Sequence, residues 1–280
     1  MSVHACRLRF VAATRPTFLA PFLGAAFIFS CALRSQTVLT WSSGDILNST
    51  TGLGATLSVP TISNLHTVNL TTTGSHTFDG RTVVNDGTIN WSGGNFVAGN
   101  SGTLTNNATF NDTSTGTFAN SGVGGTTMTF NNTAGAVYNK QSAGTKDTGV
   151  VFTNAGTVNV DTGTLRFNAG GSSTGTIDAD AGTTVQFTNS YSVPDLSKLI
   201  GAGIYELTGG TLSAGGSLNV ATFNQSGGTL AGTLTVASGN TWFQNTALFL
   251  DNPNGADRSN RGFALVPRIG GERSKVVISS

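Results

Sequence analysis

One short phrase returns four times between Arg81 and Val160, and this repetition decides the fold. Its copies combine asparagine with small turn residues and an apolar end: VNDGTI at 84–89, TNNATF at 105–110, FNNTAGAV at 130–137 and FTNAGTV at 152–158. The leading asparagines are separated by 21, 25 and 23 residues: Asn85, Asn106, Asn131 and Asn154. Self-similarity at a period in the twenties predicts a solenoid in which each repeat forms one coil.

Each repeat also carries two apolar residues with one residue between them. These pairs are Ile89/Trp91, Ala108/Phe110, Met128/Phe130, Val158/Val160, Leu165/Phe167, Val185/Phe187, Leu218/Val220 and Leu234/Val236. Residues two apart on a strand point to the same face, so each pair predicts two side chains in the core. A strand this short buries its apolar face only when the next coil stacks on it. We therefore expect six marker residues to be buried and stacked: Ile89, Phe110, Phe130, Val158, Phe167 and Phe187.

The predicted fold is all-β, a single elongated parallel β-helix (β-solenoid) over residues 36–245 with coils of about 18–25 residues. Residues 36–80 alternate polar and apolar but lack the phrase, which predicts an atypical N-terminal cap and first coils. The stretch 192–201 has helical spacing between Pro194 and Gly201, which predicts a short helical turn. Recurring asparagines predict a ladder of side-chain hydrogen bonds along the stack.

The first 35 residues differ in kind from the rest. Arg7, Arg9 and Arg15 precede an apolar run from Phe18 to Leu33 that ends in small residues. This layout predicts a secretory signal peptide over residues 1–35. The alternatives are an uncleaved membrane anchor, for which the run is slightly short, and a lipoprotein acylated at Cys31.

Composition narrows the function classes once this segment is removed. The chain has 14 basic and 13 acidic residues, and loss of residues 1–35 leaves 10 basic ones and a net charge of −3. This balance argues against nucleic acid as a partner and against attachment to an anionic membrane surface. Both cysteines lie in the first 35 residues, so the body would fold without disulfides. We expect no integral membrane association after signal removal.

Two phrases in the C-terminal half carry a family resemblance: GIYELTGGTL at 203–212 and FNQSGGTLAGTLTV at 223–236. They resemble the β-strand repeats of secreted bacterial surface proteins, of which autotransporter passengers and filamentous-haemagglutinin-type adhesins are examples. The resemblance covers roughly residues 36–243. It implies a right-handed parallel β-helix that is exposed at or beyond the outer membrane. Residues 246–280 lack the phrase and contain eight charged residues, which predicts a loosely ordered tail.

Residues that could carry chemistry are few. Asp178 and Asp180 share a face if their segment is a strand, as the carboxylates of a polysaccharide-cleaving β-helix would, and Arg166 lies about one coil earlier. The G-x-S-x-G pattern at 171–175 lacks the following helix and histidine partner that a serine nucleophile requires. His66, His76 and Asp79 are too few for a metal site and are expected to be polar surface residues. We therefore expect no metal and no cofactor.

The function predicted from these observations is an exported structural or adhesive surface module without catalysis. Its expected location is the cell surface or the medium, and its expected partners are surface glycans or another protein. The alternative is a carbohydrate-active β-helix enzyme of the polysaccharide lyase or glycoside hydrolase type, with Asp178, Asp180 and Arg166 as its weak candidate residues. A cleft with two or more carboxylates and a basic residue would distinguish the enzyme from the adhesin.

Overall fold

The computed structural model describes residues 37–40, 44–45, 61–62, 64, 66–71, 73–236, 241–244 and 275–277. Side chains are described between residues 61 and 232. The predicted signal peptide lies outside the described residues, as does most of the predicted tail. Strand β29 (Lys275–Val277) in that tail pairs antiparallel with β27 (Thr229–Val236).

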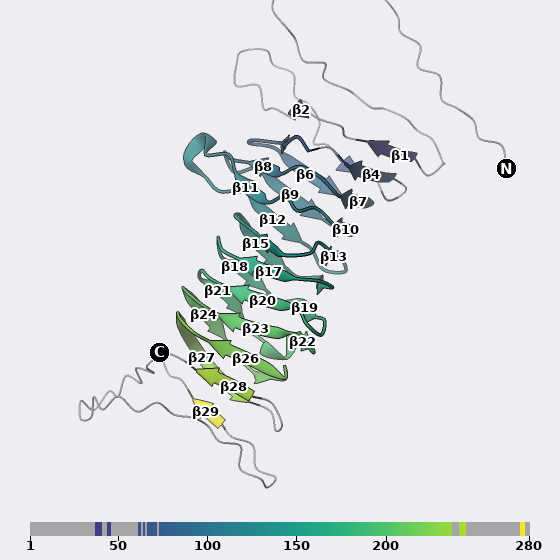
Figure 1. Cartoon of the computed structure of the whole chain (residues 1–280). Helices are drawn as coiled ribbons and strands as arrows, with labels where there is room; N and C mark the ends of the chain where they lie inside the picture. Colours follow the sequence, from purple (N-terminus) through teal and green to yellow (C-terminus); the bar gives the residue numbers. More distant parts are fainter. Residues whose placement is uncertain are drawn as a thin grey trace, which may run out of the picture. The chain divides into compact units, whose positions relative to one another are not determined.

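The described chain is an all-β parallel solenoid, as the repeat predicts (Figure 1). Sheet A stacks eight strands: β1 (Thr37–Thr40), β4 (His66–Leu70), β7 (Thr88–Trp91), β10 (Thr109–Asp112), β13 (Val137–Lys140), β16 (Thr157–Val160), β19 (Thr176–Ala179) and β22 (Leu199–Gly201). Sheet B stacks four: β2 (Gly44–Asp45), β5 (His76–Thr77), β8 (Phe96–Ala98) and β11 (Phe118–Asn120).

Two further sheets complete the coils. Sheet C contains β3 (Thr61–Ile62), β6 (Thr82–Asn85), β9 (Thr103–Asn106), β12 (Thr129–Asn132), β15 (Val151–Asn154), β18 (Gly171–Ser173), β21 (Tyr191–Val193), β24 (Thr211–Ala214), β27, β25 (Ser217–Leu218) and β29. Sheet D contains β14 (Thr145–Asp147), β17 (Thr164–Phe167), β20 (Thr184–Phe187), β23 (Ile204–Leu207), β26 (Thr222–Gln225) and β28 (Thr241–Gln244).

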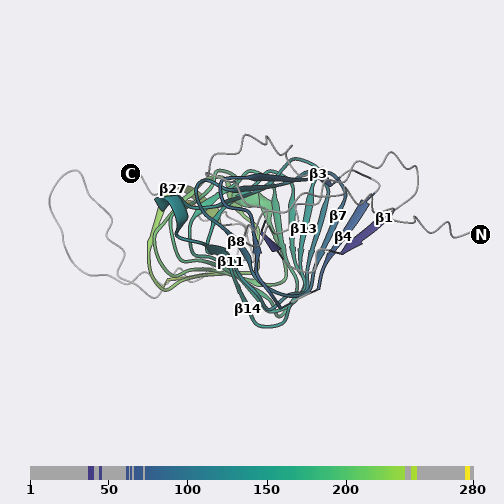
Figure 2. The same ribbon diagram turned by 90° about the horizontal axis from the view of Figure 1, so that it is seen from above.

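Each coil has three sides, and the view along the stack superimposes successive coils (Figure 2). The chain passes from sheet A to sheet B in the early coils, or to sheet D in the later ones, and then to sheet C. The change from sheet B to sheet D falls between β11 and β14, where Phe118 and Thr148 form an isolated parallel bridge. This junction contains the buried charges described below.

Coil length varies more than the sequence predicts. The register gives 18 residues from Ile204 to Thr222 but 28 from Thr109 to Val137. The long coil includes the 3₁₀ turn η1 (Val123–Gly125), so the predicted upper limit of 25 residues is wrong at this point. The helical turn predicted near residue 196 is confirmed as η2 (Leu196–Lys198), whose first turn is capped by the side chain of Asp195.

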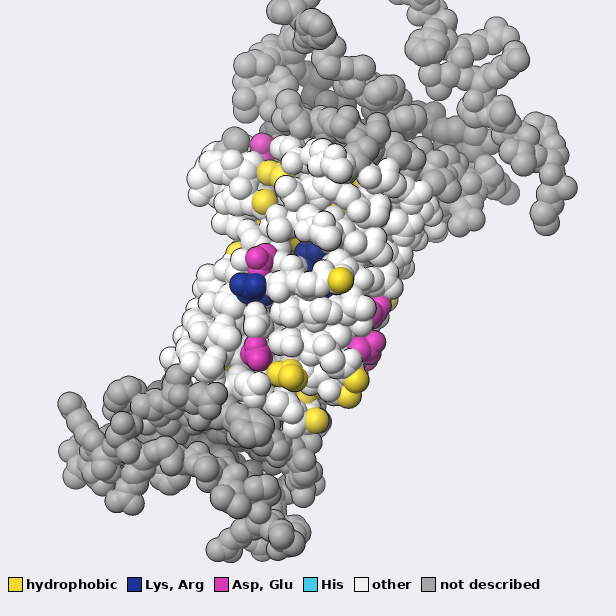
Figure 3. All heavy atoms as spheres, viewed as in Figure 1, with side chains coloured by type: hydrophobic (Ala, Val, Ile, Leu, Met, Phe, Trp, Pro, Cys, Tyr) yellow, Lys and Arg dark blue, Asp and Glu magenta, His cyan; other side chains and the backbone are white. Residues whose placement is uncertain are grey.

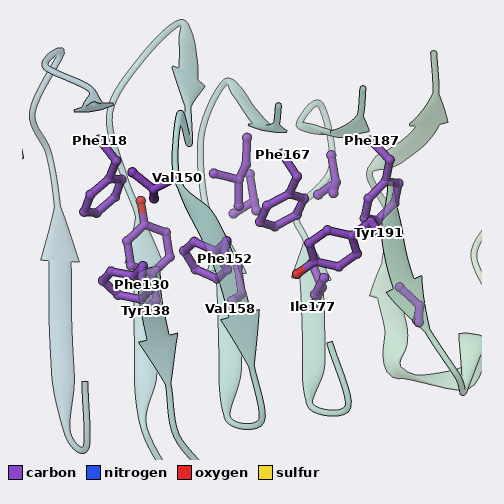
Figure 4. Close-up of a cluster of buried hydrophobic side chains, with 14 of the residues drawn as sticks. Phe118, Phe130, Tyr138, Val150, Phe152, Val158, Phe167, Ile177, Phe187 and Tyr191 are labelled. Carbon is purple, nitrogen blue, oxygen red and sulfur yellow. The ribbon is translucent and has the colours of Figure 1, made fainter. Parts of the chain in front are cut away.

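Strict alternation of buried and partly exposed residues places the core inside the coils. All six predicted marker residues are buried, and several stack on the equivalent residue of the next coil. Aromatic rings form a continuous line in which Phe130 and Phe152 stack with centroids 4.7 Å apart and Phe167 and Tyr191 do the same (Figure 4). Burial of these rings is the main stabilising contribution to the fold.

A buried asparagine ladder runs along the end of sheet C. Its side chains, in order, are Asn85, Asn106, Asn132, Asn154 and Ser173, joined by hydrogen bonds of 2.6–3.0 Å. Each asparagine also donates to a main-chain carbonyl of the following coil, such as Thr157 for Asn132. The predicted ladder is thus confirmed, but its third member is Asn132 and not Asn131, which lies on the outer side of β12.

The turn after this ladder requires glycine for a steric reason. A Cβ on Gly175 would lie 2.1 Å from the carbonyl oxygen of Gly156 in the preceding coil. We therefore expect Gly175→Ala to lower the free energy of unfolding by about 1–3 kcal/mol, because the stacked backbones must move apart. Urea unfolding measures the effect, and Thr174→Ala at the exposed neighbouring position is the control. Equal stability of the two variants would contradict the steric account.

Candidate functional site

The outer surface of sheet A carries two regular rows of polar side chains, which we call the Asn/Thr face. Its asparagine row consists of Asn69, Asn90, Asn111, Asn139 and Asn159, and its threonine row of Thr67, Thr88, Thr109, Thr157 and Thr176. Along the first row, each Nδ2 donates to the preceding Oδ1 over 2.8–2.9 Å. The ladder fixes the amides in one orientation at the repeat of the strands.

The predicted carboxylates lie at the end of this face. Asp178 follows Asn159 in the register of sheet A and points outward, and Asp180 is exposed just beyond β19. Partial burial raises the pKa of Asp178, and the nearby charges of Asp180 and Asp161 raise it further. The structure therefore brings the two predicted aspartates together, with Asp161 as a neighbour that the sequence interpretation missed.

Arg166 does not join them. It lies on β17 in sheet D and forms an ion pair with Asp147, Nε to Oδ1 3.0 Å. The alternative as an enzyme needed the arginine beside the acids, because a basic residue would neutralise the substrate's negative charge. The three candidate residues thus belong to two different sides of the coil, and they form no common site.

The remaining sequence motifs are structural. Ser173 of the G-x-S-x-G pattern is buried, accepts from Asn154 and donates to the carbonyl of Gly175, and a strand follows it. His76 is buried against Phe96, so its prediction as a surface residue is wrong. Burial lowers the pKa of His76. Among the described residues, no group of three or more His, Cys, Asp or Glu side chains could hold a metal ion.

A charged cluster inside the coils was not predicted. Asp112 at the end of β10 and Lys146 in β14 are buried, with Oδ1 and Nζ 3.0 Å apart. The hydroxyl of Tyr138 donates to the other carboxylate oxygen of Asp112 over 2.6 Å. The ammonium of Lys146 also donates to the carbonyl of Gly116 and lies 3.8 Å from the ring centroid of Trp91.

A second lysine lies beside this cluster. Lys140 is in register with Asp112 on the adjacent strand, and its Nζ donates to the carbonyls of Ser142, Gly144 and Thr162. Its three carbonyl partners hold it away from the carboxylate, although the charge of Asp112 still acts on it. Lys140 therefore closes the turn after sheet A, and Lys146 is the partner of Asp112.

Burial dominates the ionisation of the cluster. It raises the pKa of Asp112 from 3.8 to about 6, against the opposing effects of Lys146 and Tyr138. It lowers the pKa of Lys146 and lowers that of Lys140 to about 8. The acid and the amine are thus both shifted toward their neutral forms.

The sequence did contain a signal for this cluster. The inward position at the end of each sheet A strand is occupied by Trp91, Asp112, Lys140, Val160 and Ala179 in successive coils. Two charged residues thus follow an inward Phe or Tyr by two positions, where the pattern predicts an apolar side chain. Their departure from the pattern marks a buried polar site, but Lys146 has no such marker.

The fold and these contacts place the chain in the class of parallel β-solenoids. No family model matches it, and comparisons with curated proteins and with solved structures find no significant match. None of the described residues forms a helix long and apolar enough to cross a membrane.

Proposed function

We propose that this protein is an exported structural or adhesive surface module whose contact surface is the Asn/Thr face. The observation that carries the proposal is the fixed asparagine ladder on sheet A, in register from Asn69 to Asn159. Export is proposed from the signal-like pattern of residues 1–35. The resemblance to bacterial surface repeats supports both parts of the proposal.

The chemistry of the ladder suits a ligand rich in hydroxyl groups. Each side-chain amide has two N–H donors and an oxygen with two lone pairs, and one ladder bond uses one donor and one lone pair. The neighbouring threonine row adds hydroxyls at the same spacing along the stack. Contacts repeated in this way are weak singly but combine by multivalency, so we propose surface polysaccharides as the ligand class. The face visible in Figure 3 is dominated by uncharged polar side chains and backbone, which suits a neutral glycan.

Binding to immobilised polysaccharides tests the adhesive part. We expect the triple variant Asn90→Ala, Asn111→Ala, Asn139→Ala to lose binding by about tenfold or more, because each lost contact lowers the avidity of the whole row. The matched control is Thr105→Ala, Asn131→Ala, Thr153→Ala on the outer side of sheet C. A parent chain that binds none of the polysaccharides, or a control that loses as much binding, would overturn the assignment of this face.

The same panel tests the enzymatic alternative. Asp178 and Asp180 are the only residues of that hypothesis that the structure brings together. Polysaccharide cleavage by the parent that disappears in Asp178→Ala, Asp180→Ala would favour the enzyme. Export is tested separately, by comparing the location of the full chain with that of a chain lacking residues 1–35.

A further inference from the structure

We propose that Asp112 and Lys146 join covalently, forming an intramolecular isopeptide bond that links β10 to β14 inside the solenoid. The reactants are a carboxyl group and a primary amine held 3.0 Å apart, Oδ1 to Nζ. Both side chains are almost fully excluded from solvent, at 0% and 1% exposure. The proposal concerns the interior of the chain and stands independently of the proposed function.

The first argument is positional. Asp112 is held on one side by the hydroxyl of Tyr138 and by the backbone N–H of Ser114. Lys146 is held by the carbonyl of Gly116 and by the face of Trp91. Reacting groups fixed in this way behave as if present at very high concentration, because their translational and rotational freedom was lost on folding.

The second argument is electrostatic. A buried ion pair loses hydration that its own attraction does not fully replace, so a dry interior favours transfer of the proton from the ammonium to the carboxylate. Burial moves the pKa of both groups in this direction. The pair then consists of a free amine and a carboxylic acid, which are the forms that condense. No proton has to be gained from or lost to solvent.

The step balances without any co-reactant. The lone pair of Lys146 Nζ attacks Asp112 Cγ, and the tetrahedral intermediate places negative charge on a carboxyl oxygen. Tyr138 donates its O–H to Asp112 Oδ2 and would stabilise that charge, which makes it the catalytic residue of the step. A proton passes from Nζ to the departing hydroxyl group, the C–O bond breaks, and one water molecule leaves as the amide forms.

The location gives the bond a structural purpose. Sheet B ends at β11 and sheet D begins at β14, so the regular parallel ladder on this side of the coil is interrupted at the junction. A covalent link from residue 112 to residue 146 crosses that interruption and ties the early coils to the later ones. Stacked coils contact only their neighbours, so a break at one junction would otherwise separate the two parts.

Peptide mass spectrometry of the full chain tests the proposal. After denaturation and complete tryptic digestion, an unlinked chain gives peptides 82–140, 141–146 and 147–166. The isopeptide bond blocks cleavage after Lys146 and joins peptide 82–140 to peptide 141–166, with the loss of one water molecule. We expect this species in the folded parent and in Lys140→Arg, and we expect it to be absent in Lys146→Arg. Circular dichroism confirms that each variant is folded.

Kinetics distinguish the role of Tyr138. In Tyr138→Phe, which retains the ring in the core, we expect the cross-link to form at least about tenfold more slowly than in the parent after refolding. Formation at the parental rate would overturn the role assigned to the hydroxyl. Unlinked peptides alone from a folded and aged parent would overturn the proposal and leave Asp112 and Lys146 as a buried salt bridge.

Discussion

Replacing Phe130 by alanine is expected to lower the free energy of unfolding by about 3–5 kcal/mol. Phe130 is fully buried, and its ring contacts those of Phe118, Tyr138 and Phe152 with centroids 4.7–5.4 Å apart. Truncation removes apolar area and leaves a cavity that stacked strands cannot close, because their spacing is fixed by backbone hydrogen bonds. Urea unfolding followed by far-ultraviolet circular dichroism measures the loss.

Two comparisons show whether the cavity causes the loss. Phe130→Leu keeps most of the apolar volume and should cost clearly less than the alanine variant, while the exposed Thr127→Ala should stay within about 0.5 kcal/mol of the parent. Hydrogen exchange should increase first in β9, β12 and β15, because neighbouring coils share the damaged core. An alanine variant as stable as the leucine variant would show that this ring contributes little to the core.

The fold was predictable because its signals are local. Alternation over three or four residues selects the inward side chains, and small turn residues separate the strands, so Ile89 and Phe187 could be placed in the core from the sequence. The exact register was harder. Asn131 and Asn132 are adjacent, and only the backbone pairing of Phe130 with Phe152 decides that Asn132 continues the ladder. The 28-residue coil obscured that alignment.

The sites depend on information that single strands do not carry. Asp178 and Arg166 are close in sequence, yet their strands join sheets A and D and lie on different sides of the coil. Asp112 and Lys146 are far apart in sequence, yet the path of the chain through the long coil brings them into contact. Sequence distance therefore gave a false association in the first case and concealed a true one in the second.

The second large effect is expected at Lys146. We expect Lys146→Met to lower the free energy of unfolding at neutral pH by about 3–5 kcal/mol, because the variant leaves the carboxylate of Asp112 buried without its cation. The prediction holds whether the parent carries an ion pair or an isopeptide bond, since the variant can form neither. Loss of a covalent link would add to the cost. Urea unfolding at about pH 7 measures the effect.

Acidification should restore part of this loss. In the folded chain burial already raises the pKa of Asp112 from 3.8 to about 6, and removing the positive charge of Lys146 raises it further. The folded variant therefore binds a proton that the unfolded chain lacks at any pH between these values, so its stability falls as the pH rises through the folded pKa. We expect the variant to gain stability from about pH 7 to pH 5 relative to Lys140→Arg, which keeps the pair.

The double variant Asp112→Leu, Lys146→Met decides whether the uncompensated charge is the cause. Replacing both partners removes the buried carboxylate together with its cation, so the double variant should recover most of the stability lost by Lys146→Met. It should also lose the acid-dependent gain, because the group that titrates is absent. A double variant that is as unstable as the single one at every pH would show that Lys146 stabilises the junction through its contacts with Gly116 and Trp91, and not through the charge of Asp112.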